Sequence, residues 1–228
     1  MHQMVSKRPI NWKSKPQFVP IWCDTENIRK KNLPENYFRN LWNITTDNFV
    51  VGYSGNLAKF HPIETFIHAA EILNDHNDIN FIFVGEGAKK KWAQSYCEKN
   101  NLTNCLFQSY VERRHLGSLL DSFDCGLVGL NENQTGLSVP SKTIGLMSAG
   151  VPVIACVSPE SETALMLEEN DSGVLVSPDC SKSLSDMILK LKHDRSLLEK
   201  FQRNSFLAVK NKLNLQNISN HYFEVLNS

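Results

Sequence analysis

The chain has 228 residues, of which 41% are hydrophobic and 21% are charged, so it can bury one sizeable core. Lysine plus arginine and aspartate plus glutamate each total 24. Without a net charge the chain has no overall field that would attract nucleic acid or an anionic membrane, so any anion site must be local.

Secretion and membrane spanning are not expected. The first residues are basic but lack an apolar signal core, and no later stretch approaches the ~20 apolar residues that a spanning helix needs. The six cysteines form no C-x-x-C pair, which favours buried, reduced thiols over a disulfide or zinc framework. We therefore expect a cytoplasmic protein without a transmembrane segment, which reaches the inner face of the membrane only where a partner carries it there.

The chain opens with an irregular segment. Residues 1–47 contain four prolines and three of the four tryptophans, and we interpret them as a lead-in or interdomain segment. Exposed tryptophans favour contact with a partner surface.

From residue 48 onward, short β-branched and aromatic runs alternate with amphipathic segments, as in βαβ units. The predicted strands are Phe49–Ser54, Ile79–Val84, Cys105–Ser109, Cys125–Leu130, Val153–Val157 and Val174–Ser177. They are hydrophobic almost throughout, so both faces of the sheet should be covered. The sequence therefore predicts an α/β fold in residues 48–194, a Rossmann-like doubly wound parallel sheet of about six strands.

Helices should connect these strands. They are predicted through Ile63, Phe66, Ile67 and Ala70, with Pro62 as the first helical residue, and over Lys89–Lys99, Arg113–Phe123, Pro140–Ala149 and Glu160–Glu168. Gly150 is expected just beyond the end of the fourth helix. Further helices are predicted over Ser181–Lys192, over Arg195–Lys210 and along the apolar stripe of Leu215, Ile218, Tyr222 and Val225, so that residues 195–228 form C-terminal helices. We expect residues 1–47 and 213–226 to bind a partner or a second copy.

In open α/β sheets ligands bind beyond the carboxyl ends of the strands. After the first strand, Gly55 lets the backbone approach an anion and Lys59 lies just before a helix. A plain turn with a solvated lysine explains these residues equally well. After the second strand, Gly85-Glu86-Gly87 offers a tight turn, which by itself is more typical of an ordinary loop.

The third loop runs from Gly136 to Lys142. A lysine in the first turn of a helix opposes the helix dipole by roughly 0.3–1 kcal/mol, so Lys142 is unfavourably placed unless an anion binds there. The alternative is a surface lysine tolerated at small cost. A bound diphosphate would supply the missing negative charge.

Several chemistries lack their motif. The sequence has no P-loop, no G-x-S-x-G elbow, no H-E-x-x-H helix and no Asp-x-Asp after a strand. His61 is interpreted as a neighbour of a helix cap and His68 as a surface residue. We therefore expect no metal and no cofactor, with the charge of a diphosphate met by lysines, hydroxyls and backbone N–H groups.

Three segments in this order carry a resemblance: F-V-V-G-Y-S-G-N-L-A-K, F-I-F-V-G-E-G and V-P-S-K-T-I-G-L-M-S-A-G-V-P-V-I-A. From about residue 19 to residue 228 the chain resembles the C-terminal domain of the family four retaining glycosyltransferases, near the branch that builds bacterial surface polysaccharides. The resemblance implies the C-terminal half of a GT-B fold, which binds a nucleoside diphosphate sugar without metal.

By position, the resemblance implies that Lys59 and Lys142 neutralise the diphosphate and act as the catalytic residues. Gly55 and Asn56 would lie against the diphosphate and Ser141 would add a hydroxyl. The base would be bordered by Tyr110 and Val111, the donor sugar would face the loop 136–139, and Glu86 or Glu162 would reach sugar or ribose hydroxyls. The full set of implied binding residues is Ser54, Gly55, Asn56, Glu86, Gly87, Tyr110, Val111, Leu137, Ser138, Val139, Ser141 and Glu162.

The sequence departs from the family pattern in three ways. Many relatives carry arginine where Lys59 stands, and the two glutamates of the family's E-x7-E motif would fall near Leu137 and Gly145, neither of which is acidic. Ribose recognition must therefore differ. The family's N-terminal acceptor domain has no counterpart before residue 1, which we interpret as a fragment, a truncated start or half of a two-chain enzyme.

The expected function is therefore binding of a donor, with UDP-sugar favoured, for a hexosyl or N-acetylhexosaminyl transfer in glycan or polysaccharide synthesis. The isolated chain should bind the nucleotide and turn over little without an acceptor domain or chain. The alternative is a non-catalytic scaffold or regulatory module that partners a separate acceptor-domain chain. A small enzyme related to sugar-nucleotide epimerases is a third possibility without motif support.

Overall fold

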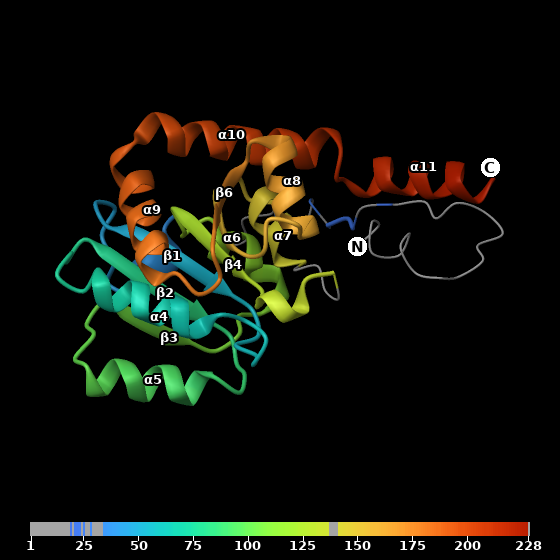
Figure 1. Cartoon of the computed structure of the whole chain (residues 1–228). Coiled ribbons are helices and arrows are strands. Elements are labelled where there is room, and N and C mark those ends of the chain that lie inside the picture. The colour runs from blue at the N-terminus through green and yellow to red at the C-terminus, as the bar shows by residue number, and fades with distance from the viewer. Residues whose placement is uncertain are drawn as a thin grey trace.

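The computed structural model describes residues 19, 21–23, 25, 28, 34–136 and 141–227. Its centre is a parallel sheet with the strand order β3-β2-β1-β4-β5-β6 (Figure 1). The strands are β1 (Phe49–Ser54), β2 (Ile79–Val84), β3 (Cys105–Gln108), β4 (Cys125–Gly129), β5 (Val153–Cys156) and β6 (Gly173–Val176). The predicted α/β fold is confirmed, and every strand lies within one residue of its predicted bounds.

Helices cover both faces of the sheet. One core contains side chains of α4 (Ile63–Ile72), α5 (Lys90–Lys99) and α9 (Ser181–His193). The other contains side chains of α3 (Tyr37–Leu41), α6 (Leu116–Leu120), α7 (Lys142–Ser148) and α8 (Glu162–Asn170). In β1 the buried Val51 and Tyr53 enter the first core and Val50 enters the second, as the two-residue period of a strand requires. This two-sided burial explains why the strands are hydrophobic almost throughout.

Two predicted helices differ in detail. Helix α4 begins at Ile63, so Pro62 precedes the first helical residue instead of occupying it. The helix predicted over residues 113–123 is a short 3-10 turn, η1 (Arg113–His115), followed by α6, which ends at Leu120. The chain leaves this helix early because Phe123 packs flat over Gly52, where an added Cβ would lie 2.1 Å from the ring. Gly150 follows α7 with a φ of 71°, as predicted for a glycine beyond a helix end.

Arg39 of α3 fastens the segment before β1 to the sheet. Its guanidinium donates to the backbone oxygens of Ser122 and Asn48, each at 3.0 Å, and to Asp124 Oδ2 at 2.7 Å. The same carboxylate oxygen accepts the backbone N–H of Val50 at 2.6 Å. One buried arginine therefore joins α3 to the start of β1 and to the start of β4.

The tryptophans of residues 1–47 do not share one environment. Trp22 is 48% exposed, whereas Trp42 is half-buried against Phe38, with ring centroids 5.4 Å apart. The expectation of exposed tryptophans is therefore wrong for Trp42, because α3 packs it on the second core. Trp12 lies outside the described residues.

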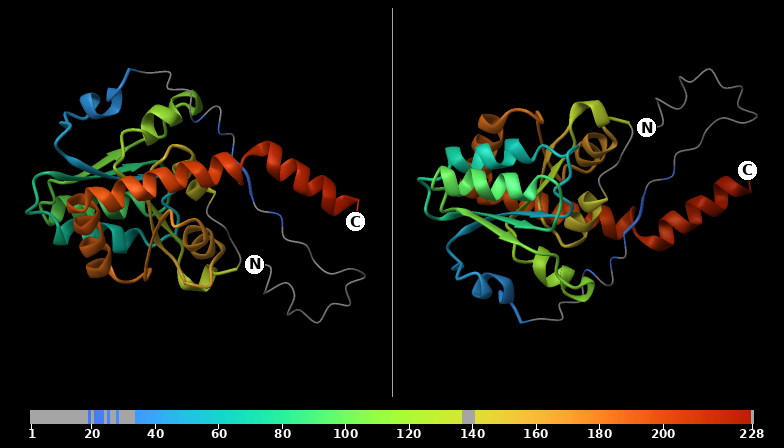
Figure 2. Two further views of the ribbon diagram at one scale, coloured as in Figure 1. Left: turned by 90° about the horizontal axis from the view of Figure 1, so that it is seen from above. Right: turned by 90° about the horizontal axis from the view of Figure 1, so that it is seen from below.

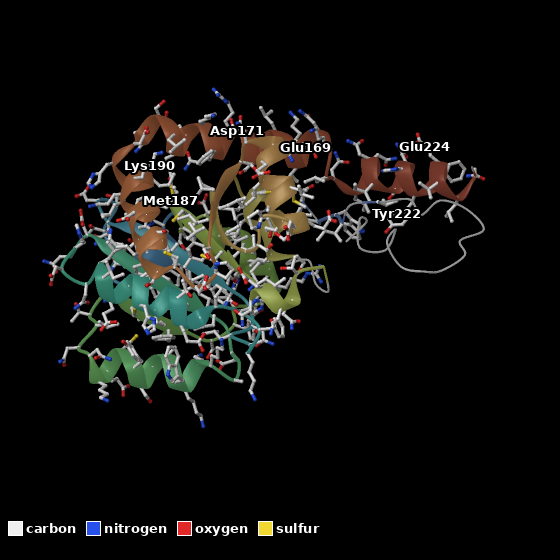
Figure 3. All side chains as sticks on the ribbon, viewed as in Figure 1. Glu169, Asp171, Met187, Lys190, Tyr222 and Glu224 are labelled. Carbon is white, nitrogen blue, oxygen red and sulfur yellow. The ribbon has the colours of Figure 1, made fainter. Side chains whose placement is uncertain are left out.

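The C-terminal helices differ in how closely they pack on the sheet domain. Helix α10 (Arg195–Asn211) buries residues in both cores, namely Leu198, Phe201, Ala208 and Val209. Ion pairs of Lys200 with Asp171 and of Lys212, just after the helix, with Glu169 measure 2.5 and 2.9 Å and tie it to the end of α8. The two acidic residues are labelled in Figure 3. Helix α11 (Leu215–Leu226) extends beyond the sheet domain, as both views in Figure 2 show.

Two further features of the described residues are the burial of the cysteines and the length of the apolar helices. Cys97, Cys125 and Cys156 are buried and Cys23, Cys105 and Cys180 are half-buried, and none of these six described cysteines forms a disulfide. In the described part of the chain, no helix is both long enough and apolar enough to span a bilayer.

The role of Arg39 gives a direct test of the fold. Replacing Arg39 by methionine removes the cationic partner of Asp124 and the donor to two backbone oxygens, so we expect a loss of about 3–5 kcal/mol in the free energy of unfolding, measured with urea. The control is Arg195→Met, because Arg195 pairs with Glu199 on the surface and such pairs contribute about 0–1 kcal/mol. Equal effects of the two substitutions would contradict the role given to Arg39.

Candidate functional site

The loops that follow β1, β2 and β3 pack together at the carboxyl edge of the sheet. The backbone N–H of Gly55 donates to Val84 O at 2.9 Å, and that of Gly85 donates to Gln108 O at 2.9 Å. A Cβ added to Gly85 would lie 2.0 Å from Gly55 O, and the φ of Gly85 is 148°. Glycine is therefore required at position 85 for two backbone turns to touch.

Lys142 reaches this cluster from the other side of the sheet. It lies in the first turn of α7, as predicted, and is the first residue of that helix, but its side chain crosses to β1. Its Nζ donates to the phenol oxygen of Tyr53 at 2.7 Å and lies 4.0 Å from the centroid of that ring. A Cβ added to Gly55 would lie 3.1 Å from the same Nζ. The ammonium group therefore borders the glycine turn after β1.

The surroundings of Lys142 do not compensate its charge. Within the described residues its ammonium forms no ion pair, and burial lowers its pKa to about 7. Burial, followed by the charge of Lys142, lowers the pKa of His61 to about 4, so this imidazole is neutral at pH 7. His61 is buried and its Nδ1 hydrogen-bonds Gly129 O at 2.6 Å. Among the described residues, the site therefore contains one lysine whose ammonium charge no carboxylate neutralises and one histidine that is neutral at pH 7.

His68 does not lie free on the surface as expected. It is half-buried, and its ring lies 5.2 Å from Tyr96 and 6.4 Å from Trp92, both on α5. The expected surface position is therefore wrong, because α5 covers this part of α4. Neither histidine contributes to a metal site: among the residues described, no three His, Cys, Asp or Glu side chains are grouped to hold a metal ion.

Lys59 occupies the exposed part of the loop between β1 and α4. Its backbone oxygen accepts a hydrogen bond from Asn131 Nδ2 at 3.3 Å, which joins this loop to the one after β4. The described contacts bring Lys142, and not Lys59, to Gly55. The neutralising role of Lys59 therefore stays a prediction that depends on its flexible side chain reaching a ligand.

The carboxylate of Glu86 already has partners. It accepts hydrogen bonds from Lys90 Nζ at 2.7 Å and Ser109 Oγ at 2.9 Å, and these lower its pKa. Its side chain is still 53% exposed. Asn56 is exposed beside Gly87, where an added Cβ would lie 2.4 Å from Asn56 Oδ1. Both side chains are placed at the edge of the cluster, and their contact with a ligand stays a prediction.

The other predicted residues that the structure describes follow strands of the sheet or precede its helices. Ser54 ends β1, and Tyr110 is 56% exposed, next to Gly85. Val111 is half-buried and packs against the second core. Ser141 is exposed before α7 and its side chain does not cap that helix. Glu162 is the first residue of α8, and Leu137, Ser138 and Val139 lie outside the described residues.

Sequence reasoning left out Tyr53 and Lys90. Lys90 donates to Gly85 O at 2.9 Å as well as to Glu86, so it holds the turn after β2. Tyr53 carries a hydroxyl at a strand position that faces the core, and a buried phenol needs a polar partner. A tyrosine at a core-facing strand position was therefore the feature of the sequence that could have identified Tyr53 as functional.

Comparisons with known proteins place these features in a wider context. The family model described as "Glycosyl transferases group 1" matches residues 35–207. The chain is 24% identical over 169 residues, 73% of its length and 41% of the relative's, to the putative colanic acid biosynthesis glycosyl transferase WcaI of Escherichia coli (strain K12). It is 23% identical over 178 residues, 78% of its length and 42% of the relative's, to the probable glycosyltransferase WbjE of Pseudomonas aeruginosa.

Among solved structures, the Anabaena protein HepE in complex with UDP and glucose superposes with a TM-score of 0.78 at 17% identity, over 92% of this chain and 56% of that one. This likeness confirms the fold that the resemblance implied, half of a GT-B structure. The chain spans about two fifths of the length of the two curated relatives.

The charge of Lys142 predicts a pH-dependent cost to stability. In the unfolded chain this lysine has its ordinary pKa of 10.5, against about 7 in the folded protein, so between these values the unfolded chain binds more protons and stability rises with pH. Lys142→Met should therefore raise the free energy of unfolding by about 1–2 kcal/mol below pH 7, and this gain should shrink toward pH 10.5. Urea unfolding of both proteins from pH 6 to pH 10 measures the difference. A difference that is independent of pH would contradict the assignment.

Proposed function

The chain belongs to the group 1 glycosyl transferase family, and from this premise we propose that the carboxyl edge of its sheet binds a nucleoside diphosphate sugar as donor. The observation that carries the proposal is the Lys142 ammonium, which borders the turn at Gly55 without a carboxylate partner in the described residues. A buried cation without a counterion is costly in a folded protein. An anionic ligand at this turn would remove that cost.

The proposed nucleotide is a uridine diphosphate. HepE, which shares the fold, was crystallised with UDP and glucose, which supports uridine as the base. In this proposal the diphosphate lies against Gly55 and Asn56, and the exposed Tyr110 borders the base. Its charge is met by Lys142, Lys59, the hydroxyl of Ser141 and backbone N–H groups, with no metal ion.

The proposed reaction is glycosyl transfer with retention at the anomeric carbon, in the synthesis of a polysaccharide or another glycan. As the bond between sugar and diphosphate breaks, negative charge grows on the leaving diphosphate. Cationic groups fixed beside that charge stabilise the transition state more than the ground state. Lys142 would act in this way from a fixed position and Lys59 from a flexible one.

An acceptor-binding half must supply the other substrate in this proposal. The curated relatives are more than twice as long as the part that this chain spans. Helix α11 leaves the sheet domain with Tyr222 50%, Phe223 71% and Leu226 81% exposed, and the labelled Tyr222 lies on this helix in Figure 3. At the start of α11, Asn214 forms an isolated parallel β-bridge with Cys23, the residue after Trp22. We propose that this apolar surface packs against the acceptor half or, without it, against a second copy.

Calorimetry with UDP tests the donor site. The parent chain should bind UDP saturably, and Lys142→Met should weaken binding by about 10- to 150-fold, as for the loss of a hydrogen bond to a charged group. Lys59→Met should weaken it by a smaller factor because Lys59 is exposed, and Lys210→Met, on the exposed side of α10, serves as the control. If the parent shows no saturable binding of UDP, the scaffold or regulatory alternative takes the place of the donor-binding role.

Sedimentation tests the α11 surface. The isolated chain should associate as its concentration rises, because aromatic and aliphatic groups on α11 are exposed together. The double substitution Phe223→Glu and Leu226→Glu should shift it to a monomer. Leu165→Glu on α8, where the leucine is 45% exposed, is the matched control and should leave association unchanged. A parent chain that stays monomeric at every concentration would refute self-association through this surface.

A further inference from the structure

Tyr53 occupies a core-facing position of β1, where an apolar ring such as phenylalanine would be expected. Its side chain is fully buried among aromatic rings, with centroid separations of 5.6 Å to Phe66 and 6.2 Å to Phe83. A hydroxyl in such a core is unfavourable unless it is hydrogen-bonded. The hydroxyl of Tyr53 therefore needs hydrogen-bond partners in this core.

The hydroxyl of Tyr53 connects two loops. It donates to Asn56 O at 2.6 Å, which fixes the turn that follows β1, and it accepts from Lys142 Nζ at 2.7 Å. The ring also lies 4.0 Å from that ammonium, a distance at which a cation is attracted to an aromatic face. A single residue thus links β1, the turn at Gly55 and the start of α7.

This contact restrains a side chain that is otherwise flexible. A lysine has four rotatable bonds and loses much freedom when its ammonium is held at one point. On Tyr53 the ammonium is held beside Gly55 before any ligand arrives. It has three N–H donors, and Tyr53 uses one of them.

We propose that Tyr53 is a positioning residue for the nucleotide: its phenol oxygen and ring hold the Lys142 ammonium beside Gly55, ready to meet the diphosphate. The proposal rests on the proposed function. Tyr53 itself need not touch the ligand, since its effect passes through Lys142 and through the backbone of Asn56.

The proposal has a pH signature. Lys142 is partly deprotonated near neutral pH when the site is empty, and a bound diphosphate favours its charged form. UDP affinity should therefore fall above pH 7. The titratable groups that face Lys142 or its partner are His61, Tyr53 and Tyr110. His61 stays neutral above pH 6, and burial raises the pKa of Tyr53 far above the range tested, so neither changes charge there.

The decisive variant is Tyr53→Phe, which keeps the ring among the aromatic side chains and removes only the hydroxyl. In calorimetric titrations from pH 6.5 to pH 9, UDP affinity should fall by about 3- to 10-fold, as for one hydrogen bond. Loss of the acceptor also disfavours the ammonium form of Lys142, so the decline in affinity should begin at lower pH than in the parent. Tyr96→Phe is the control, because its hydroxyl donates to Glu71 of α4 and not to a residue of the three loops at the site.

A double-mutant cycle separates positioning from a general structural effect. In a Lys142→Met background, Tyr53→Phe should weaken UDP binding no further, since the group that it positions is gone. Unchanged affinity and pH onset in Tyr53→Phe, or an equal loss in both backgrounds, would overturn the inference while the parent still binds UDP. Failure of the parent to bind UDP would instead reject the proposed function on which the inference depends.

Discussion

The site depends on one constraint of the sheet: β1 lies between β2 and β4, although β4 follows β3 in the chain. The connections after β1 and β4 therefore leave toward opposite faces, so that α4 packs on the first core and α7 on the second, and the carboxyl ends of these two strands form a switch point of the sheet. Tyr53 comes from β1 and Lys142 from the helix after β4, and they are 89 residues apart in sequence. Their contact exists because the strand order brings these two connections to the same edge.

The fold could be predicted from the sequence because the strands β1, β2, β4 and β5 are buried almost throughout, which leaves a continuous hydrophobic run at each of them. Helix ends were less predictable. The early end of α6 depends on Phe123 covering Gly52, a contact between residues 71 positions apart in the chain that no local pattern contains. The same reason applies to Arg39, which looks like an ordinary surface residue in the sequence and is buried against Ser122 and Asp124, 83 and 85 residues away.

At the candidate site, sequence reasoning found the loops but not the contacts within them. Lys142 was singled out because a cation is unfavourable at a helix start, yet its observed environment is the face of a tyrosine on β1. Glu86 was selected by its place after β2, and the structure shows it already paired with Lys90. Position relative to strands is encoded locally, whereas partner choice follows from which loops the sheet brings together.

The half-buried ammonium of Lys142 is unfavourable for the stability of the fold. Burial disfavours its charged form, while a diphosphate would favour that form. A protein selected for stability alone would replace this lysine with an apolar residue of similar length. Its presence in such surroundings is consistent with stability given up for ligand binding.

The hydrogen bonds of Arg39 in α3 limit where the chain can be shortened. Arg39 lies before residue 48, and its partners lie just before the starts of β1 and β4. Removing the residues before 48 would therefore expose the carboxylate of Asp124 and uncover the second core. Trimming at residue 195 would remove side chains from both cores, since α10 contributes to each. A shortened chain that keeps these contacts must therefore extend from before α3 to the end of α10.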